Sequence, residues 1–311
     1  MQTNLANKLL KMVSHLKTRN ASADDHSPIG LLAGWGKFPI EVAEALRCAG
    51  HRVAGVGIVD HADPQLAELC DHFDWIGIGG IGKAIRHFRR WGVTQATMAG
   101  KVHKVLLYQP GWWLKHRPDW KTIRAFSPQL FFGSGDRKDD TMLRTVVAAF
   151  ARDGIRFEPA TDYAPELLVK AGQIAGKRLT NKQLGDVEFG WKIAKSMGGL
   201  DIGQSICIKD QTVIAVEAIE GTDACIRRAS VLCQAGKFTV VKVAKPRQDM
   251  RFDVPTVGLK TLETMAAAGG EVLAVEADRT ILLDQQQFCR EAKHLGIAVV
   301  AYTEAVAQAA A

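Results

Sequence analysis

The clearest structural signal in the sequence is Ile29-Gly30-Leu31-Leu32-Ala33-Gly34-Trp35-Gly36-Lys37-Phe38-Pro39, an apolar strand, a glycine turn and the start of a helix. Further strands are predicted at 53–59, 73–78 and 93–98, with helices between them. Strands that alternate with helices indicate a parallel doubly wound sheet, whose ligands bind beyond the carboxyl ends of the strands. We therefore expect a ligand site at the turns, with these substrate-binding residues: Gly34, Gly36, Gly79, Gly82 and Lys83.

The first turn also matches part of a dinucleotide-binding fingerprint. Gly34-Trp35-Gly36 supplies a GxG, and Asp60 follows the second predicted strand, where a ribose-binding acid would lie. Pro39, however, stands where the third glycine of the fingerprint would allow close helix–strand packing. The sequence therefore favours a turn that needs glycine, or that holds another phosphate, over NAD binding. An NAD(P)-dependent oxidoreductase that uses this sheet is kept as an alternative function.

Length and charge indicate the domain organisation and the class of partner. A chain of 311 residues is long for one core, so we expect two domains. The predicted parts are a basic N-terminal extension (1–28), a Rossmann-like domain (29–158), a connection (159–181) and a catalytic domain (182–311). The net charge of +7 favours anionic partners. Nucleic acid is not an expected partner, because the positive charge is dispersed and no recognition motif appears.

The second half has no further Rossmann repeat. Its predicted elements are helices at 165–170, 186–198, 258–268 and 285–295, a hairpin of strands 205–209 and 212–217, and strands at 238–243, 271–275, 280–283 and 297–301. The predicted fold class is therefore α/β, with a Rossmann-like parallel sheet in the N-terminal domain and a mixed α+β C-terminal domain.

A charge-rich loop follows the strand predicted at 238–243. Residues 242–255 contain lysines, arginines and aspartates, with a proline near each end. Cations in such a loop suit phosphate oxygens, and carboxylates suit a divalent metal or a water to be deprotonated. The alternative is a solvated loop with surface ion pairs. Chemistry is favoured by a second cluster at 217–228, where acids and arginines meet at a strand-to-helix turn, a position suited to a metal-bridged diphosphate.

The distribution of histidines limits the choice of metal. Residues 117–293 contain none, so a metal bound there would need oxygen ligands. Oxygen ligands point to Mg²⁺, or to Mn²⁺, rather than to zinc. A general base in this region would be a carboxylate, a lysine or a metal-bound hydroxide.

Two segments raise the question of membrane contact, although no run of eighteen apolar residues could span a bilayer. Residues 1–28 combine apolar positions at helical spacing with lysines, which is typical of a helix on an anionic membrane or of a frayed terminus. The tryptophan-rich segment 106–120 suits an acyl chain, a bilayer interface, or a packed domain or dimer interface. The six cysteines form no CxxC pair and read as reduced thiols of a cytosolic protein.

Several motifs together resemble the LpxI family of UDP-2,3-diacylglucosamine pyrophosphatases, which act in lipid A synthesis. The motifs are Gly34-Trp35-Gly36-Lys37-Phe38-Pro39, Lys138-Asp139-Asp140, Asp201-Ile202-Gly203-Gln204, Glu220-Gly221-Thr222-Asp223-Ala224 and the run from Lys242 to Gly258. The resemblance extends in order from residue 29 to the last predicted strand. Two positions depart from the family pattern: Trp35 interrupts a run of three glycines, and Cys225 replaces the usual methionine.

The resemblance implies an activity and a setting. It implies magnesium-dependent hydrolysis of the diphosphate of UDP-2,3-diacylglucosamine to UMP and 2,3-diacylglucosamine 1-phosphate (lipid X). It also implies a cleft between two domains, a homodimer, and a cytoplasmic protein, with peripheral contact at the inner membrane as an open question. The best-supported catalytic aspartate of the family falls on Asp253, and the Gly-Thr-Asp-Ala motif places a second on Asp223.

Motif and charge together give the remaining site predictions. The catalytic residues are predicted to be Asp253, Asp223, Lys245 and Arg251, and the metal ligands Asp253, Asp223 and Glu220. The substrate-binding residues of the second domain are predicted to be Asp201, Gln204, Thr222, Arg227, Lys242 and Gln248. A non-catalytic nucleotide- or lipid-binding protein of the same fold is the other alternative.

Overall fold

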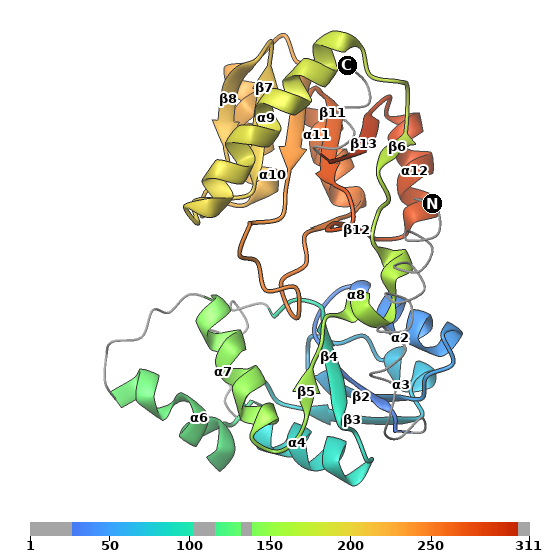
Figure 1. Ribbon diagram of the computed structural model, residues 1–311, viewed down its shortest axis with the longest axis vertical. Helices are drawn as coiled ribbons and strands as arrows, with labels where there is room; N and C mark the ends of the chain where they lie inside the picture. The colour runs from blue at the N-terminus through green and yellow to red at the C-terminus, as the bar shows by residue number, and fades with distance from the viewer. Residues whose placement is uncertain (1–26, 103–115, 132–138, 304–311) are drawn as a thin grey trace, which may run out of the picture.

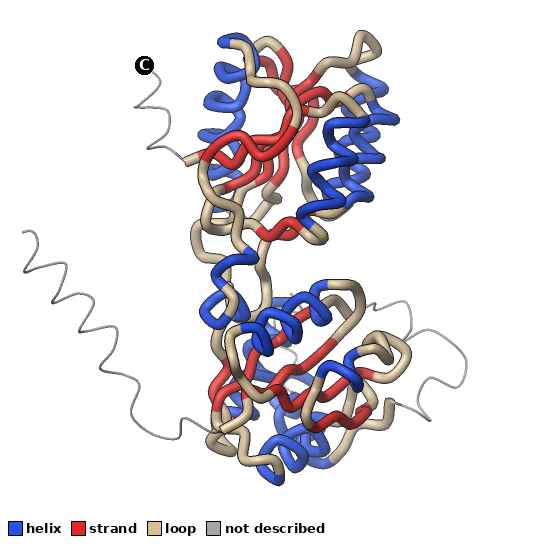
Figure 2. Tube along the Cα trace, turned by 90° about the vertical axis from the view of Figure 1, so that its right-hand side faces the viewer, coloured by secondary structure: helices blue, strands red, loops and turns tan. Residues whose placement is uncertain are grey.

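The protein, described here by a computed structural model over residues 27–102, 116–131 and 139–303, consists of two domains arranged one above the other (Figure 1). In each domain, helices pack on the faces of a central sheet (Figure 2). Most of the predicted N-terminal extension lies outside the described residues, as do Trp112, Trp113 and Lys138. Within the described ranges, no helix is long and apolar enough to cross a membrane.

The N-terminal domain is built on a five-stranded sheet in the order β3-β2-β1-β4-β5, in which every neighbouring pair is parallel. This confirms the predicted Rossmann-like sheet. The strand order reverses between β1 and β4, the point beyond which ligands of doubly wound folds bind. The strands are β1 (Ile29–Ala33), β2 (Val53–Ile58), β3 (His72–Ile76), β4 (Gln95–Ala99) and β5 (Arg156–Phe157), and the helices are α2 (Phe38–Cys48), α3 (Leu66–Leu69), α4 (Ile81–Arg90), α6 (Trp120–Phe131) and α7 (Asp139–Ala151).

The C-terminal domain is built on a six-stranded sheet in the order β6-β13-β11-β9-β7-β8. β9, β11 and β13 are parallel, whereas β6, β7 and β8 pair with their neighbours in the antiparallel sense, which confirms the predicted mixed domain. The strands are β6 (Gly172–Ala175), β7 (Ser205–Lys209), β8 (Thr212–Val216), β9 (Phe238–Lys242), β11 (Gly270–Glu276) and β13 (Ala298–Tyr302), with β10 (Thr256–Val257) and β12 (Ile281–Leu282) forming a separate parallel pair; the helices are α9 (Asn181–Gly199), α10 (Thr222–Leu232), α11 (Leu259–Ala268) and α12 (Gln285–His294).

Both faces of this second sheet are covered by apolar helix surfaces. Helix α9 packs on one face, and Gly190 allows the close approach, since a Cβ there would lie 2.8 Å from Val241 Cγ2. Ile226 of α10, Leu262 of α11 and Phe288 of α12 belong to the core on the other side. Apolar residues cover the middle of the sheet on both faces. The polar side chains of the candidate site therefore lie at the strand ends.

Local signals explain where the structure departs from the predicted elements. Helix α9 begins at Asn181 instead of 186, because Thr180 and Gln183 form a reciprocal capping box. The helix predicted at 165–170 is instead a 3₁₀ turn, η3 (Pro165–Leu167), because Leu168 turns extended and pairs with Ile281. The short helix α8 (Ala160–Tyr163) precedes it.

Besides the connecting chain, the described parts of the two domains meet at an ion-pair site and at a docked loop. At the first, Asp284 at the start of α12 donates its backbone N–H to Glu41 Oε1 (2.8 Å), and its carboxylate lies 3.6 Å from Lys37 Nζ. Burial raises the pKa of the Glu41 carboxyl at this contact. At the second, the loop between β9 and β10 reaches the lower domain (Figure 1), and Phe252 packs against its core. The predicted charge-rich loop therefore bridges the domains.

Candidate functional site

A buried lysine occupies the centre of the candidate site. Lys242 is the last residue of β9 and is only 8% exposed. Its Nζ donates to Thr222 Oγ1 (3.3 Å) and to the carbonyl of Thr256 (3.3 Å). Within the described part of the chain it forms no ion pair. Since an ammonium group has three donors, one N–H of Lys242 remains for a bound anion.

Charges from both domains act on this lysine. Burial lowers the pKa of Lys242, and Lys101 of the N-terminal domain lowers it further, whereas Glu217, Asp223 and Asp253 raise it. Asp223 and Asp253, which were predicted from separate motifs, therefore lie close enough to influence the same ammonium. The site combines cations of two domains with two carboxylates, the composition needed to hold a diphosphate and to orient a water.

The first turn of α10 forms one wall of the site. Ser205 stands opposite Lys242 in the β7–β9 pair, and its Oγ lies 3.1 Å from Thr222 Oγ1. Thr222 Oγ1 donates in turn to Glu217 Oε1 (3.0 Å). Asp223 lies in the same helical turn, where the helix dipole favours a carboxylate. The hydroxyl chain fixes Thr222, so that its oxygen is held toward Lys242.

A second ion pair fixes the start of the charge-rich loop. Glu276 at the end of β11 is buried and accepts from Lys195 Nζ at 2.9 and 3.0 Å. The backbone N–H of Ala244 donates to Glu276 Oε2 (2.7 Å), and the backbone carbonyl of Ala244 accepts from Lys195 Nζ (3.1 Å). The backbone two residues after Lys242 is therefore held by side chains of α9 and β11.

Four of the predicted polar ligands come from two segments. Lys245 and Gln248 belong to this loop, and Asp201 and Gln204 lie just before β7. Lys245 Nζ donates to Asp201 Oδ1 (2.6 Å), and its backbone N–H donates to Gln248 Oε1 (2.8 Å). Gln204 Oε1 and Gln248 Nε2 are buried without a hydrogen-bond partner among the described residues. Buried amide atoms normally have partners, so these two are available to a ligand.

The tip of the loop is docked on the N-terminal domain. Arg251 donates from Nε and Nη2 to Asp249 at 2.8 and 2.7 Å. This bond lowers the pKa of Asp249, and Arg144 of α7 in the other domain adds to the effect. The backbone N–H groups of Phe252 and Asp253 both donate to the carbonyl of Asp249, at 3.3 and 3.0 Å. The turn thus presents Asp253 directly beside the docked Phe252.

Two predicted residues lie outside the hydrogen-bond network around Lys242, as far as the described residues show. The carboxylate of Glu220 pairs with Arg228 and accepts from the backbone N–H of Ala218. Hydrogen bonds from its own backbone N–H and from Arg228 lower the pKa of Glu220. Arg227 is exposed on α10. Over the described residues, no group of three or more His, Cys, Asp or Glu side chains could hold a metal ion. The three predicted metal ligands are therefore not gathered in one cluster.

Backbone hydrogen bonds hold the first glycine turn, Gly34-Trp35-Gly36, against the segment that follows β4. Trp35 and Lys101 exchange two backbone hydrogen bonds of 2.7 and 2.9 Å, which links the end of β1 to the end of β4. A Cβ at Gly34 would lie 2.7 Å from the carbonyl oxygen of Lys101, so this glycine is required for packing. Gly36, with φ of 107°, faces open space. The bridge brings Lys101 to the carboxyl edge of the sheet, toward Lys242.

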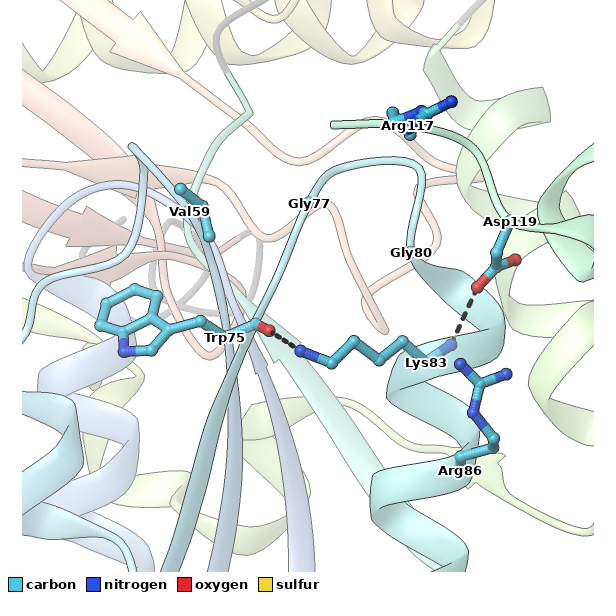
Figure 3. A pocket seen from close by; sticks show the side chains of 8 residues that line it. All are labelled: Val59, Trp75, Gly77, Gly80, Lys83, Arg86, Arg117 and Asp119. Carbon is cyan, nitrogen blue, oxygen red and sulfur yellow. Dashed lines mark hydrogen bonds between the residues drawn. The ribbon is translucent and has the colours of Figure 1, made fainter. Parts of the chain in front are cut away.

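The other predicted glycines lie beside a separate cavity of about 540 Å³ at the ends of β2 and β3 (Figure 3). A Cβ at Gly79 would lie 2.7 Å from the His116 carbonyl, and one at Gly82 would lie 2.7 Å from Asp119 Oδ2. Lys83 donates from Nζ to the Trp75 carbonyl (2.8 Å) and from its backbone to Asp119 Oδ2 (2.9 Å). Here the glycines allow residues 116–119 to pack closely against the start of α4.

Comparison with known proteins assigns the family. The model of the LpxI N-terminal domain matches residues 28–167, and that of the LpxI C-terminal domain matches residues 170–300. The chain belongs to the LpxI family. It is 31% identical over 287 residues to the UDP-2,3-diacylglucosamine pyrophosphatase LpxI of Caulobacter vibrioides, an alignment that covers 88% of this chain and 96% of that protein. The resemblance of the motifs to the LpxI family is thereby confirmed.

In this LpxI family member, the sequence predictions missed several residues of the site, among them Lys101, Lys195 and Glu276. Lys101 lies two residues beyond the end of β4, beside the first glycine turn, and that position was the available signal. Lys195 and Glu276 lie within a helix and at the end of a strand, and no local pattern distinguishes them from surface charges. Their role follows only from the fold, which brings both to Ala244.

Proposed function

We propose that the chain hydrolyses the diphosphate of UDP-2,3-diacylglucosamine to UMP and 2,3-diacylglucosamine 1-phosphate, a step of lipid A biosynthesis. Membership of the LpxI family and the named activity of the Caulobacter vibrioides relative support the reaction. The observation that carries it is the buried Lys242, with Asp223, Asp253 and the other domain's Lys101 close enough to act on its charge.

Hydrolysis of an anhydride needs positive charge at the phosphoryl oxygens and a water held in line with the departing group. Lys242 and Lys101 supply the positive charge from opposite domains, with Lys245 at the loop. Asp253 orients or deprotonates the attacking water, and Asp223 assists it. Arg251 is a further candidate for the diphosphate, although Asp249 already holds two of its nitrogens.

Mg²⁺, or Mn²⁺ in its place, fits the residues present only if the substrate supplies part of the ligands. Magnesium is commonly held by one or two carboxylates together with substrate phosphates, rather than by a full protein cage. Asp223 and Asp253 provide two such carboxylates, both close to Lys242. Asp223 Oδ2 also lies 3.7 Å from Lys260 Nζ, and Glu220 is paired with Arg228. When bound, the ion would neutralise charge on the phosphoryl oxygens.

The two buried glutamines are assigned to the uridine or the sugar. Gln204 Oε1 is an unused acceptor and Gln248 Nε2 an unused donor among the described residues. Uracil offers both a donor and acceptors, and sugar hydroxyls offer the same, so the pair can recognise a neutral part of the substrate. Thr222 and Asp201 fix the cations Lys242 and Lys245 that would face the diphosphate.

The setting is proposed from the family as well: a cytoplasmic homodimer that meets its lipid substrate at the inner membrane. Size-exclusion chromatography with light scattering tests the dimer. A monomer at working concentration would contradict it.

The activity is tested by incubation with UDP-2,3-diacylglucosamine and Mg²⁺ in ¹⁸O-labelled water. The expected result is UMP and 2,3-diacylglucosamine 1-phosphate in equal amounts, with one ¹⁸O in one of the two phosphates. Binding of the substrate without products would support a non-catalytic protein instead. Binding of NAD(P) in preference to UDP sugars would support the oxidoreductase alternative.

A further inference from the structure

Helix α6 carries an exposed face that is both apolar and basic. Trp120 is 76% exposed and Ile123 is 38% exposed, and Arg124 is exposed beside them. Residues three and four apart share one side of a helix, so these three form one surface. Exposed single apolar residues are ordinary, but a tryptophan and an isoleucine beside a cation are typical of a surface that meets a bilayer.

The cavity of Figure 3 is lined in part by Arg117 and Asp119, the residues just ahead of α6 in the chain. Its lining residues carry an excess of positive charge. Arg86 and Arg117 line it and are exposed, and neither has an ion-pair partner among the described residues. Asp119 is the one acid in this lining as far as the described residues show, against the three cations Lys83, Arg86 and Arg117, so positive charge stays in excess. Its oxygens accept from the backbone N–H groups of Lys83 and Thr122, each at 2.9 Å. In the view of Figure 3, Asp119 lies between the two arginines.

We infer that this surface, formed by Arg86, Arg117, Trp120, Ile123 and Arg124, docks the protein on an anionic phospholipid bilayer. Arg86 and Arg117 each bind a headgroup phosphate at the mouth of the cavity, since a guanidinium group binds phosphate with two parallel hydrogen bonds. Trp120 and Ile123 enter the headgroup region, where an indole is favourable. The lipid substrate of the proposed function gives the docking a use, but the chemistry of the surface does not depend on hydrolysis.

The test is sedimentation of the full chain with vesicles of phosphatidylcholine, with and without phosphatidylglycerol, in the absence of substrate. Each basic residue near an anionic membrane strengthens binding by about fivefold. The double variant R86Q/R117Q should therefore bind phosphatidylglycerol vesicles roughly 25-fold more weakly than the unchanged chain. R290Q/K293Q, which also removes two exposed cations, both from α12 in the other domain, is the matched control and should bind as the unchanged chain does.

A further variant, W120A, separates insertion from charge. It should weaken binding to the same vesicles while preserving its dependence on salt, whereas R86Q/R117Q should reduce that dependence. Because residues 1–28 are the same in every variant, their own contribution cancels in the ratios. Equal binding of R86Q/R117Q and the unchanged chain would overturn the inference, as would equal binding of the unchanged chain to neutral and anionic vesicles. The vesicle assay does not measure hydrolysis, so its result is independent of whether the proposed activity is correct.

Discussion

Truncation of Phe252 tests whether docking of the charge-rich loop positions Asp253 for catalysis. Phe252 belongs to the C-terminal domain but packs, partly buried, against the core of the N-terminal domain. Replacing a fully buried phenylalanine by alanine costs about 3–5 kcal/mol, so roughly 2 kcal/mol is reasonable for a half-buried ring. At 1.36 kcal/mol for each factor of ten, this corresponds to roughly thirtyfold in the equilibrium between docked and undocked loop. The kcat/KM of Phe252→Ala should fall by up to that factor.

The assay is steady-state hydrolysis of UDP-2,3-diacylglucosamine, with the radius of gyration in solution as a second reading. Phe252→Leu keeps most of the apolar contact and should lose no more than about threefold. Val231→Ala, at an exposed position of α10, is the control and should keep the original rate. Unchanged kcat/KM in Phe252→Ala, or an equal loss in the leucine variant, would refute the positioning role.

Three further changes test individual charges. Asp253→Ala should abolish turnover while UDP still binds in calorimetry, and turnover near the original rate would remove Asp253 from the mechanism. Glu220→Gln should keep both turnover and its dependence on Mg²⁺, because Arg228 already holds this carboxylate; a loss of the metal dependence would place Glu220 among the ligands. Because burial lowers the pKa of Lys242, activity should decline with rising pH before the ordinary lysine range is reached. Lys101→Gln removes a cation that lowers the same pKa, so it should move this alkaline decline to higher pH, and an unmoved profile would contradict the proximity of the two lysines.

Much of the fold follows from local patterns. Apolar strands alternating with helices predicted the first sheet, and the positive φ angles of Asp210 and Gln211 (53° and 54°) match the tight hairpin expected across them. The start of α9 was misplaced because a capping box outweighs the apolar periodicity that suggested 186. The reciprocal hydrogen bonds of Thr180 and Gln183 decide that boundary.

The candidate site was only partly accessible from sequence, because its charges come from distant segments. Asp223, Asp253 and Lys242 could be nominated from motifs, since each stands at a strand end or in a charged turn. Glu220 was nominated for its nearness to Asp223 in sequence, yet the turn before α10 directs it to Arg228. Lys101 acts on the pKa of Lys242 from the other domain, and the spacing of residues in the sequence does not reveal this relation.

The most direct test of the central role of Lys242 is the rate of UDP-2,3-diacylglucosamine hydrolysis by Lys242→Met, compared with the unchanged chain. Methionine fills the same buried volume without the charge, and cooperative thermal unfolding would show that the variant is folded. Removing one such preorganised donor typically costs a factor of about 10²–10³, so kcat should fall by at least a hundredfold. A folded Lys242→Met variant that hydrolyses the substrate at the original rate would contradict the account.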